Sequence, residues 1–186
     1  MSLVMAVICT DGIVVSGDFR RSRYVKDSET GETKFEYYDD QHKIFSTSQN
    51  RIIGTTGNCN LKSGELVDDV IKELVSPDSQ MIFTIKNEIG LMASMISNNN
   101  NSVIEAGIEN GKKSIFVYTP TNGIEEVEKS VAIGATEELN QYKEKIESEL
   151  QNVTVEEAKN LLHQYNELVA LHDPTVSRGC EFLTIT

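Results

Sequence analysis

The sequence predicts an α+β fold, a four-layer αββα sandwich in which two antiparallel sheets pack together and helix pairs cover them. Short β-branched runs bounded by turn residues alternate with longer amphipathic stretches, in the order strands, two helices, strands, two helices, strand. No linker rich in Pro, Gly or Ser interrupts the 186 residues, and no repeat is present. This length suits one core, so we expect residues 1–186 to form a single domain.

The first eighteen residues carry the clearest local pattern. An apolar run from Leu3 to Ile8, a Thr-Asp-Gly turn and a second β-branched run ending at Asp18 predict a buried hairpin. The first run is too short to span a membrane and lacks the basic region of a signal peptide, so we expect it to belong to the fold. Its terminus either packs as an ordinary first strand or brings an α-amine into a site.

The other elements are predicted from the alternation of apolar residues in strands and from their recurrence every three or four residues in helices. The polar excursion of residues 24–40 predicts an exposed hairpin or flap. The remaining predicted strands are 43–48, 51–57, 103–108, 114–119, 125–133 and 181–185. The predicted helices are 60–75, 79–96, 137–150 and one that opens with a capping box at Thr154 and Glu157.

Composition and charge exclude several classes of protein. Hydrophobic residues make up 39% of the chain and charged residues 25%, which is typical of a globular protein rather than a disordered one. The net charge is −12, and no Lys/Arg cluster is long enough to follow a phosphate backbone, so we expect neither nucleic acid nor membrane as a partner.

Cysteine and histidine usage point to a cytoplasmic protein without a metal or cofactor. The three cysteines, Cys9, Cys59 and Cys180, are odd in number and unclustered, which favours reduced thiols. The three histidines show no metal-ligand spacing. A thiol nucleophile built from Cys59 with His172 and Asp173 has no supporting spacing.

Four residues stand at the start or end of the first four predicted strands: Ser2, Asp18, Lys43 and Gly57. Taken singly, the acid and the lysine are typical of a strand-end ion pair, and the glycine of a strand end. Together, in this layout, the sequence resembles the β-type subunits of the proteasome and the related bacterial protease subunits, which are N-terminal-nucleophile hydrolases. The resemblance rests on Met5 to Asp18, Lys43-Ile44-Phe45, Thr56-Gly57 and Ala132-Ile133-Gly134.

The resemblance implies an amide hydrolase of the threonine/serine type, with Ser2 as nucleophile once Met1 is removed. The free α-amine of the same residue would act as general base, through water. Lys43, held charged by Asp18, would favour the deprotonated forms of that amine and hydroxyl. The N–H of Gly57 would donate to the oxyanion. A chain that keeps Met1, or that lacks a hydroxyl at position 2, would have no such nucleophile.

Two departures from the family pattern concern the groups around the nucleophile. The family has an aspartate and a serine near the C-terminus, for which Asp173 and Ser177 are the nearest candidates, one residue too far apart. A further serine of the family is replaced by Ala135.

The function implied is cleavage of amide bonds in peptides or unfolded protein by a self-assembled cytoplasmic ring, with an ATPase unfoldase as a further partner. The alternatives are an inactive scaffold or assembly subunit of the same fold, which Ala135 favours, and a small-molecule amidase.

Overall fold

The computed structural model describes residues 2–47, 49–57, 71, 84–95 and 101–186. The strands are β1 (Leu3–Ile8), β2 (Ile13–Asp18), β3 (Arg20–Lys26), β4 (Thr33–Asp39), β5 (Ile44–Ser46), β6 (Ile52–Thr56), β7 (Ser102–Glu109), β8 (Lys112–Thr119), β9 (Gly123–Val127), β10 (Ser130–Gly134) and β11 (Cys180–Ile185). The helices are α2 (Ile85–Met95), α3 (Glu137–Asn140), α4 (Lys143–Glu149) and α5 (Val155–His172). The predicted helix 60–75 lies outside the described residues, apart from residue 71.

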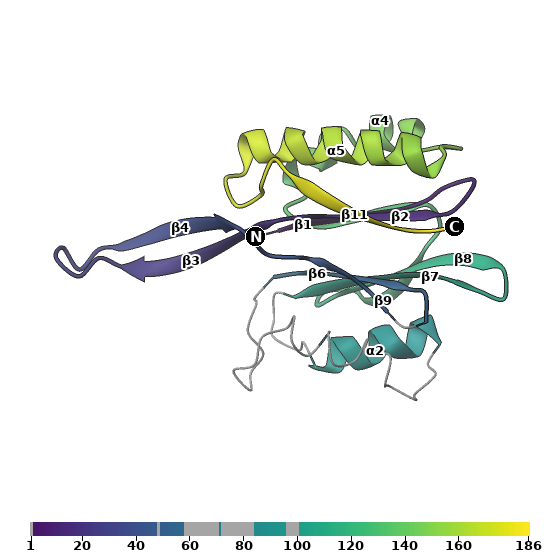
Figure 1. Cartoon of the computed structure of the whole chain (residues 1–186), viewed down its shortest axis with the longest axis horizontal. Coiled ribbons are helices and arrows are strands. Elements are labelled where there is room, and N and C mark those ends of the chain that lie inside the picture. The colour runs from purple at the N-terminus through teal and green to yellow at the C-terminus, as the bar shows by residue number, and fades with distance from the viewer. Residues whose placement is uncertain (1, 48, 58–70, 72–83, 96–100) are drawn as a thin grey trace.

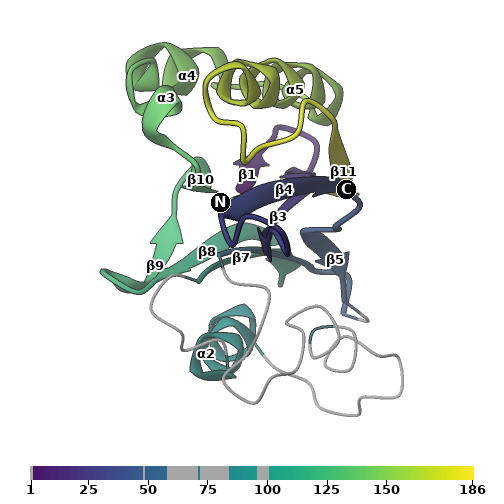
Figure 2. The ribbon, with the colours of Figure 1, turned by 90° about the vertical axis from the view of Figure 1, so that its left-hand side faces the viewer.

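The described strands form three sheets, and the pairings among these strands are antiparallel. The strand orders are β10-β1-β2-β11, β3-β4 and β5-β6-β7-β8-β9. Helices α4 and α5 lie on the outer side of the four-stranded sheet, and α2 lies beyond the five-stranded sheet (Figure 1). Turned by 90°, the molecule has α3 beside α4 and α5 at the same end (Figure 2).

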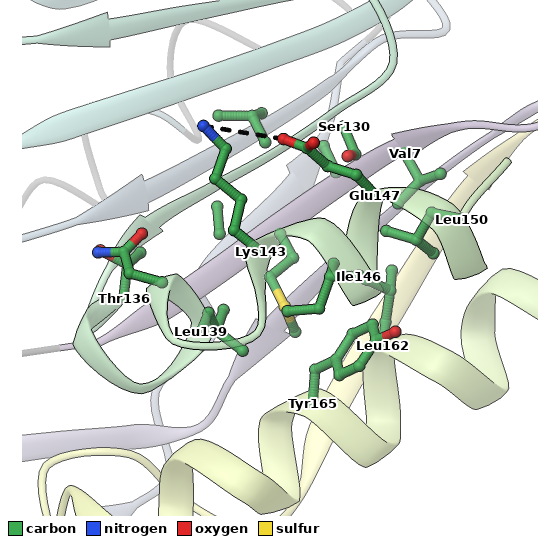
Figure 3. A pocket seen from close by; sticks show the side chains of 15 residues that line it. Val7, Ser130, Thr136, Leu139, Lys143, Ile146, Glu147, Leu150, Leu162 and Tyr165 are labelled. Atoms are coloured by element: carbon green, nitrogen blue, oxygen red, sulfur yellow. Dashed lines mark ion pairs between the residues drawn. The ribbon is translucent and has the colours of Figure 1, made fainter.

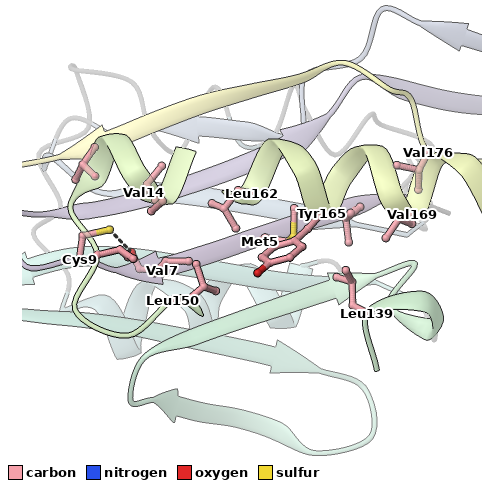
Figure 4. Packing of buried hydrophobic residues seen from close by; sticks show 14 of the residues in the cluster. Met5, Val7, Cys9, Val14, Leu139, Leu150, Leu162, Tyr165, Val169 and Val176 are labelled. Atoms are coloured by element: carbon pink, nitrogen blue, oxygen red, sulfur yellow. Dashed lines mark hydrogen bonds between the residues drawn. The ribbon is translucent and has the colours of Figure 1, made fainter. Parts of the chain in front are cut away.

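Strand β1 is buried on both faces because its alternate side chains enter different apolar clusters. Leu3, Met5 and Val7 join the cluster formed with α5 and the segment before it (Figure 4). Val4 and Ala6 join the cluster between the two larger sheets. A strand buried on both sides reads as a continuous apolar run, which explains why the first residues look so uniform in the sequence.

The predicted four-layer sandwich of two sheets flanked by helix pairs is wrong, because the strands form three sheets. Strands β3 and β4 carry mainly polar residues that could not enter a core, so they stand away from the body as a sheet of their own (Figure 1). We call this pair of strands the ribbon. On the side of the five-stranded sheet, α2 is the helix whose bounds lie within the described residues, and residue 71 is also helical.

Most other elements agree with the sequence, and two do not. The exposed hairpin within residues 24–40, the capping box of α5 and the last strand are confirmed. The predicted strand 125–133 is two strands, because the chain crosses at residues 128–129 from the five-stranded to the four-stranded sheet. The predicted helix 137–150 is the two short helices α3 and α4.

A cavity of about 290 Å³ lies between β1, β10 and the three C-terminal helices (Figure 3). Leu139, Leu162 and Tyr165 line it, and Lys143 and Glu147 pair at 3.8 Å beside it. None of the four strand-end residues singled out in the sequence lines this cavity.

A buried ionic cluster fixes α2 to the five-stranded sheet. Arg51 Nη1 lies 2.6 Å from Glu88 Oε2, and Arg51 Nη2 lies 2.7 Å from Glu109 Oε1. Glu105 of β7 is fully buried, and its Oε1 lies 3.5 Å from Arg51 Nη1, too far for a good hydrogen bond. Burial, and then the charge of Glu88, raise the pKa of Glu105 to about 10.

We predict that Glu105→Gln removes a pH dependence from the stability of this protein. The folded chain keeps a proton on Glu105 that the unfolded chain releases above the ordinary pKa of 4.5, so the free energy of unfolding falls as the pH rises from 4.5 to about 10. The loss is at most about 1.4 kcal/mol per pH unit. Glutamine keeps the shape and stays neutral, so urea denaturation at pH 5, 7 and 9 should give a flatter profile.

Glu109→Gln is the matched control, because Glu109 bonds the same arginine but is about one-third exposed. It should weaken the fold while leaving the pH profile as in the unsubstituted chain. Equal slopes for Glu105→Gln and the unsubstituted chain would contradict the prediction.

Candidate active site

Asp18 ends β2 with a carboxyl group that no solvent reaches. Its Oδ1 accepts the N–H of Leu3 at 2.8 Å, and its Oδ2 accepts the N–H groups of Arg20 at 2.8 Å and Ser177 at 3.2 Å. Burial raises the pKa of Asp18; the charge of Lys43 is the largest opposing influence, followed by these three N–H groups. The carboxyl group therefore joins three segments that are far apart in the sequence.

Lys43 is the second buried charged residue of the site, with 4% of its surface exposed. Its Nζ donates to the carbonyl oxygen of Arg20 at 2.6 Å. Its stem lies against β2 because Gly17 has no side chain: a Cβ there would stand 2.9 Å from the Lys43 Cβ. The lysine is thus turned into the protein, on the same side as Asp18, rather than outward into solvent.

Residue 2 lies where the start of β1 meets the end of β10. Ser2 is buried, with 6% exposure, and its carbonyl oxygen accepts the N–H of Ala135 at 2.8 Å. Gly134 has a φ of 92°, and a Cβ at this position would overlap the Ser2 carbonyl oxygen. The contact of β10 with residue 2 therefore requires glycine at 134.

The end of β6 closes the same region. The Thr56 methyl group would stand 3.1 Å from a Cβ on Gly134, so β6 ends close to the contact between Gly134 and Ser2. Gly57 follows at once, exposed and with a φ of 112°. The site thus has Ser2, Asp18 and Lys43 buried, with the predicted oxyanion donor at its exposed rim.

Ser177 and Asp173 have different places. Ser177 is buried; its Oγ accepts the N–H of Phe19 at 2.9 Å and donates to the Gly179 carbonyl at 2.6 Å. It therefore supports Asp18 rather than residue 2. Asp173 ends α5, and its Oδ1 accepts from the N–H and hydroxyl of Thr175. Among the described residues, no hydrogen bond joins Asp173 to Ser2.

A cavity of about 460 Å³ lies next to the point where Gly134 meets the Ser2 carbonyl. Gly134 and Ala135 line it from one side, and Asp173 and Pro174 from the other. Ser2 is not among the residues that line this cavity, but its contact Gly134 is. Ala135 contributes a methyl group here, where the proteasome resemblance implies a serine.

Two supporting residues were not predicted from the sequence. Asn166 of α5 is buried, and its Nδ2 donates to the carbonyl oxygens of Ser177 at 2.8 Å and Arg178 at 3.1 Å. The signal for it was a polar residue within the apolar stripe of a helix. The second is Arg20, whose backbone N–H and carbonyl bond the two buried charged residues. Nothing in the sequence could identify this role, because a backbone hydrogen bond does not depend on the residue type.

The described part of the chain offers no alternative site based on a metal, a thiol or a membrane helix. No group of three His, Cys, Asp or Glu residues there is placed to hold a metal ion. Burial raises the pKa of the Cys180 thiol to about 11, and Cys59 lies outside the described residues. Among the described helices, none combines the length and apolarity that crossing a bilayer requires.

The fold of this chain is shared with solved structures of Anbu proteins, one of which is described as an ancestral beta-subunit. The Anbu complex from Pseudomonas aeruginosa, a helical assembly, superimposes with a TM-score of 0.71 at 14% identity, over 98% of this chain and 80% of that one.

Two further Anbu structures superimpose on this chain to a similar extent. Anbu (ancestral beta-subunit) from Yersinia bercovieri gives a TM-score of 0.68 at 14% identity, over 98% of this chain and 81% of that one. A Gly-1 mutant of Anbu from Hyphomicrobium sp. strain MC1 gives 0.69 at 14% identity, over 100% and 82%.

The assignment to the proteasome β-subunit family made from the sequence is wrong as a family assignment. No protein-family model matches this chain, and no curated protein matches it. At 14% identity, the likeness to the Anbu proteins is one of fold alone. The strand-end motifs therefore reported a shared architecture rather than membership of that family.

We predict that Gly134→Ala destabilises the fold more than Gly111→Ala does. Both glycines have a positive φ, but a Cβ at 111 would meet nothing within 4 Å, whereas one at 134 would overlap Ser2. Gly111→Ala should lower the free energy of unfolding by about 1–2 kcal/mol, through the strained backbone conformation alone. Gly134→Ala should cost roughly 1–3 kcal/mol more, because β1 and β10 must separate. Urea denaturation of the two variants measures the difference, and equal losses would refute the contact.

Proposed function

We propose that this protein is an N-terminal-nucleophile hydrolase that cleaves amide bonds in peptides or unfolded protein. The observation that carries the proposal is the burial of Lys43 close enough to Asp18 to lower its pKa, together with the hydrogen bond from the N–H of Leu3, the residue after Ser2, to Asp18. The Asp18 carboxylate has a structural role as acceptor of three N–H groups, but a buried ion pair adds little net stability over apolar side chains of similar volume, so a chemical role accounts better for the Lys43 ammonium.

The proposed reaction uses groups that this chain supplies. Once Met1 is removed, the α-amine of Ser2 takes the hydroxyl proton through a water molecule, and Oγ attacks the substrate carbonyl. The Lys43 ammonium, balanced by Asp18, stabilises the negative charge that forms on Oγ. The N–H of Gly57 donates to the oxyanion. The protonated α-amine then gives its proton to the substrate nitrogen as the C–N bond breaks, and the amine product leaves an ester on Ser2. Water attacks this ester, the acid product leaves, and the hydroxyl and α-amine are restored.

Ser177 and Asp173 have indirect roles in this proposal. Ser177 holds Asp18 in place through its N–H, and Asp173 shapes the turn that follows α5. We propose both as positioning residues. The proposed chemistry uses no metal or cofactor.

We further propose that the protein works as a self-assembled ring in the cytoplasm. The helical assembly of the Pseudomonas aeruginosa Anbu complex supports self-assembly on this fold. The free thiols of Cys9 and Cys180 support a reducing compartment. An ATPase unfoldase would deliver folded substrates. Light scattering that finds only monomer at micromolar concentration would remove the assembly part of the proposal.

We predict that a β-lactone or a peptide epoxyketone labels residue 2 of the mature chain. Intact mass should rise by one inhibitor, and peptide mapping should place the adduct at the N-terminus. Ser2→Ala should abolish the label, because the hydroxyl is lost. Lys43→Met should slow labelling by about 100-fold or more, because the charge that stabilises the alkoxide is lost.

Ser114→Ala is the control for Ser2→Ala, since Ser114 is equally buried but lies in β8, away from the site. It should label like the unsubstituted chain. An unlabelled chain with Met1 removed would count decisively against hydrolysis.

A second candidate function is that of an assembly subunit without catalysis. It is favoured by Ala135, which gives no hydroxyl near Ser2, and by the contacts of Ser177, which are used up on Asp18 and its neighbours. The mass of the mature natural chain separates the two functions: a retained Met1 supports the subunit. A panel of acyl-amides beside peptides would identify a small-molecule amidase.

A further inference from the structure

Glu181, the second residue of β11, lies beside the buried lysine of the candidate site. In the β2–β11 register Glu181 is opposite Gly17, and residues opposite each other in an antiparallel pair share a face of the sheet. The missing Cβ of Gly17 leaves room on that face for the stem of Lys43. The side chain of Glu181 therefore stands on the side of the four-stranded sheet where Lys43 packs.

The carboxylate of Glu181 bonds the backbone of Lys43. Its Oε1 accepts the N–H of Lys43 at 3.2 Å, and its Oε2 lies 2.8 Å from Nδ1 of His42. The carbonyl oxygen of Lys43 accepts the N–H of Thr55 at 2.9 Å, and its Nζ donates to the Arg20 carbonyl at 2.6 Å. Lys43 is thus held at its N–H, at its carbonyl and at its ammonium. Of these three partners, Glu181 is the one that contributes a side chain, so a substitution can remove it.

The contact with His42 does not account for the place of Glu181. The His42 side chain is 66% exposed, and a pair with so exposed a partner adds little to stability. The Glu181 side chain is only 20% exposed, and a carboxylate so far withdrawn from water needs hydrogen-bond donors from the protein. The N–H of Lys43 is such a donor, so this bond is the contact of Glu181 that bears on the site.

We propose that Glu181 is a positioning residue for the hydrolysis: it fixes the backbone of Lys43 and so keeps the ammonium in place for the reaction at Ser2. Glu181 touches no reacting atom in this proposal and acts through Lys43. The inference rests on the proposed function, and it adds the start of β11 to the segments that build the site.

The backbone of Lys43 matters because the charge stands far from it, at the end of a flexible four-carbon stem. The stem packs on Gly17 and the ammonium bonds Arg20, but the direction in which the stem leaves the chain is set by the backbone at residue 43. A backbone that is free to rotate would place the ammonium less precisely. A misplacement of about 1 Å can lower the rate of a catalysed step by about 100-fold.

The test is the rate at which the β-lactone labels residue 2 of the mature full chain, followed by intact mass. Glu181→Ala removes the acceptor of the Lys43 N–H, whereas Glu181→Gln keeps an acceptor oxygen and loses the charge. Glu167→Ala is the matched control: the charges of Glu167 and Glu181 both raise the pKa of the Cys180 thiol, but Glu167 pairs with His163, at 3.8 Å. Urea denaturation checks that each variant folds. Glu181→Asp, which is one methylene shorter, replaces Glu181→Ala if that variant does not fold.

We expect Glu181→Ala to slow labelling by about tenfold, and Glu181→Gln to stay within about threefold of the unsubstituted chain. Glu167→Ala should label as the unsubstituted chain does. In a chain that carries Lys43→Met, Glu181→Ala should slow labelling no further, because a residue that acts through Lys43 has nothing left to position.

Three results would overturn the inference and leave the hydrolysis standing. They are an unchanged rate in Glu181→Ala, a rate in Glu181→Gln as low as that in Glu181→Ala, and a further loss of the same size on top of Lys43→Met. An unsubstituted chain without Met1 that takes no label would instead overturn the proposed function, and this inference with it.

Discussion

A single buried carboxylate holds the N-terminal part of this protein together. Asp18 accepts N–H groups from Leu3, Arg20 and Ser177, which belong to β1, the base of the ribbon and the loop before β11. No water reaches the group, so these donors and the charge of Lys43 replace its hydration. Any change that removes the carboxylate leaves three buried N–H groups without a partner, which is more costly than the loss of one bond.

This arrangement ties the candidate site to the ribbon. Arg20 gives its N–H to Asp18 and its carbonyl to Lys43, while its side chain reaches Asp39 on β4. The residue at the base of the exposed ribbon is therefore also a neighbour of both buried charges. Arg20 thus links the ribbon to both buried charges through a single residue.

The sequence pattern correctly predicted the features that depend on interactions between residues close together in the chain. Alternation and turn residues identified the strand pairs, and a capping box fixed the start of α5 at Thr154. The break between α3 and α4 was missed because Tyr142 fits the apolar period although it is exposed. The crossing at residues 128–129 was missed because no turn residue marks it, and a strand pattern does not record which sheet the strand joins.

In the candidate site too, the sequence identified residues by their local position but did not predict their long-range contacts. Ser2, Asp18 and Lys43 were singled out because they stand at strand ends, but their burial follows from long-range packing, such as the Lys43 stem against Gly17. The role of Ser177 depends on a loop whose path the sequence does not encode in any period. Glu105 was not predicted at all, since a glutamate in a strand is usually solvated, and only the tertiary fold buries it.

The two buried ionic groups of this chain call for different explanations. The Arg51 cluster joins a helix to a sheet, with Glu88 on one side and Glu109 on the other, so an architectural role accounts for it. Asp18 and Lys43 join strand ends beside residue 2, where apolar side chains of similar volume would pack at least as well. A fold under pressure for stability alone would gain nothing from an ammonium there. The proposed hydrolysis gives this ammonium a role that stability alone does not, because it would favour loss of the proton from a hydroxyl at residue 2.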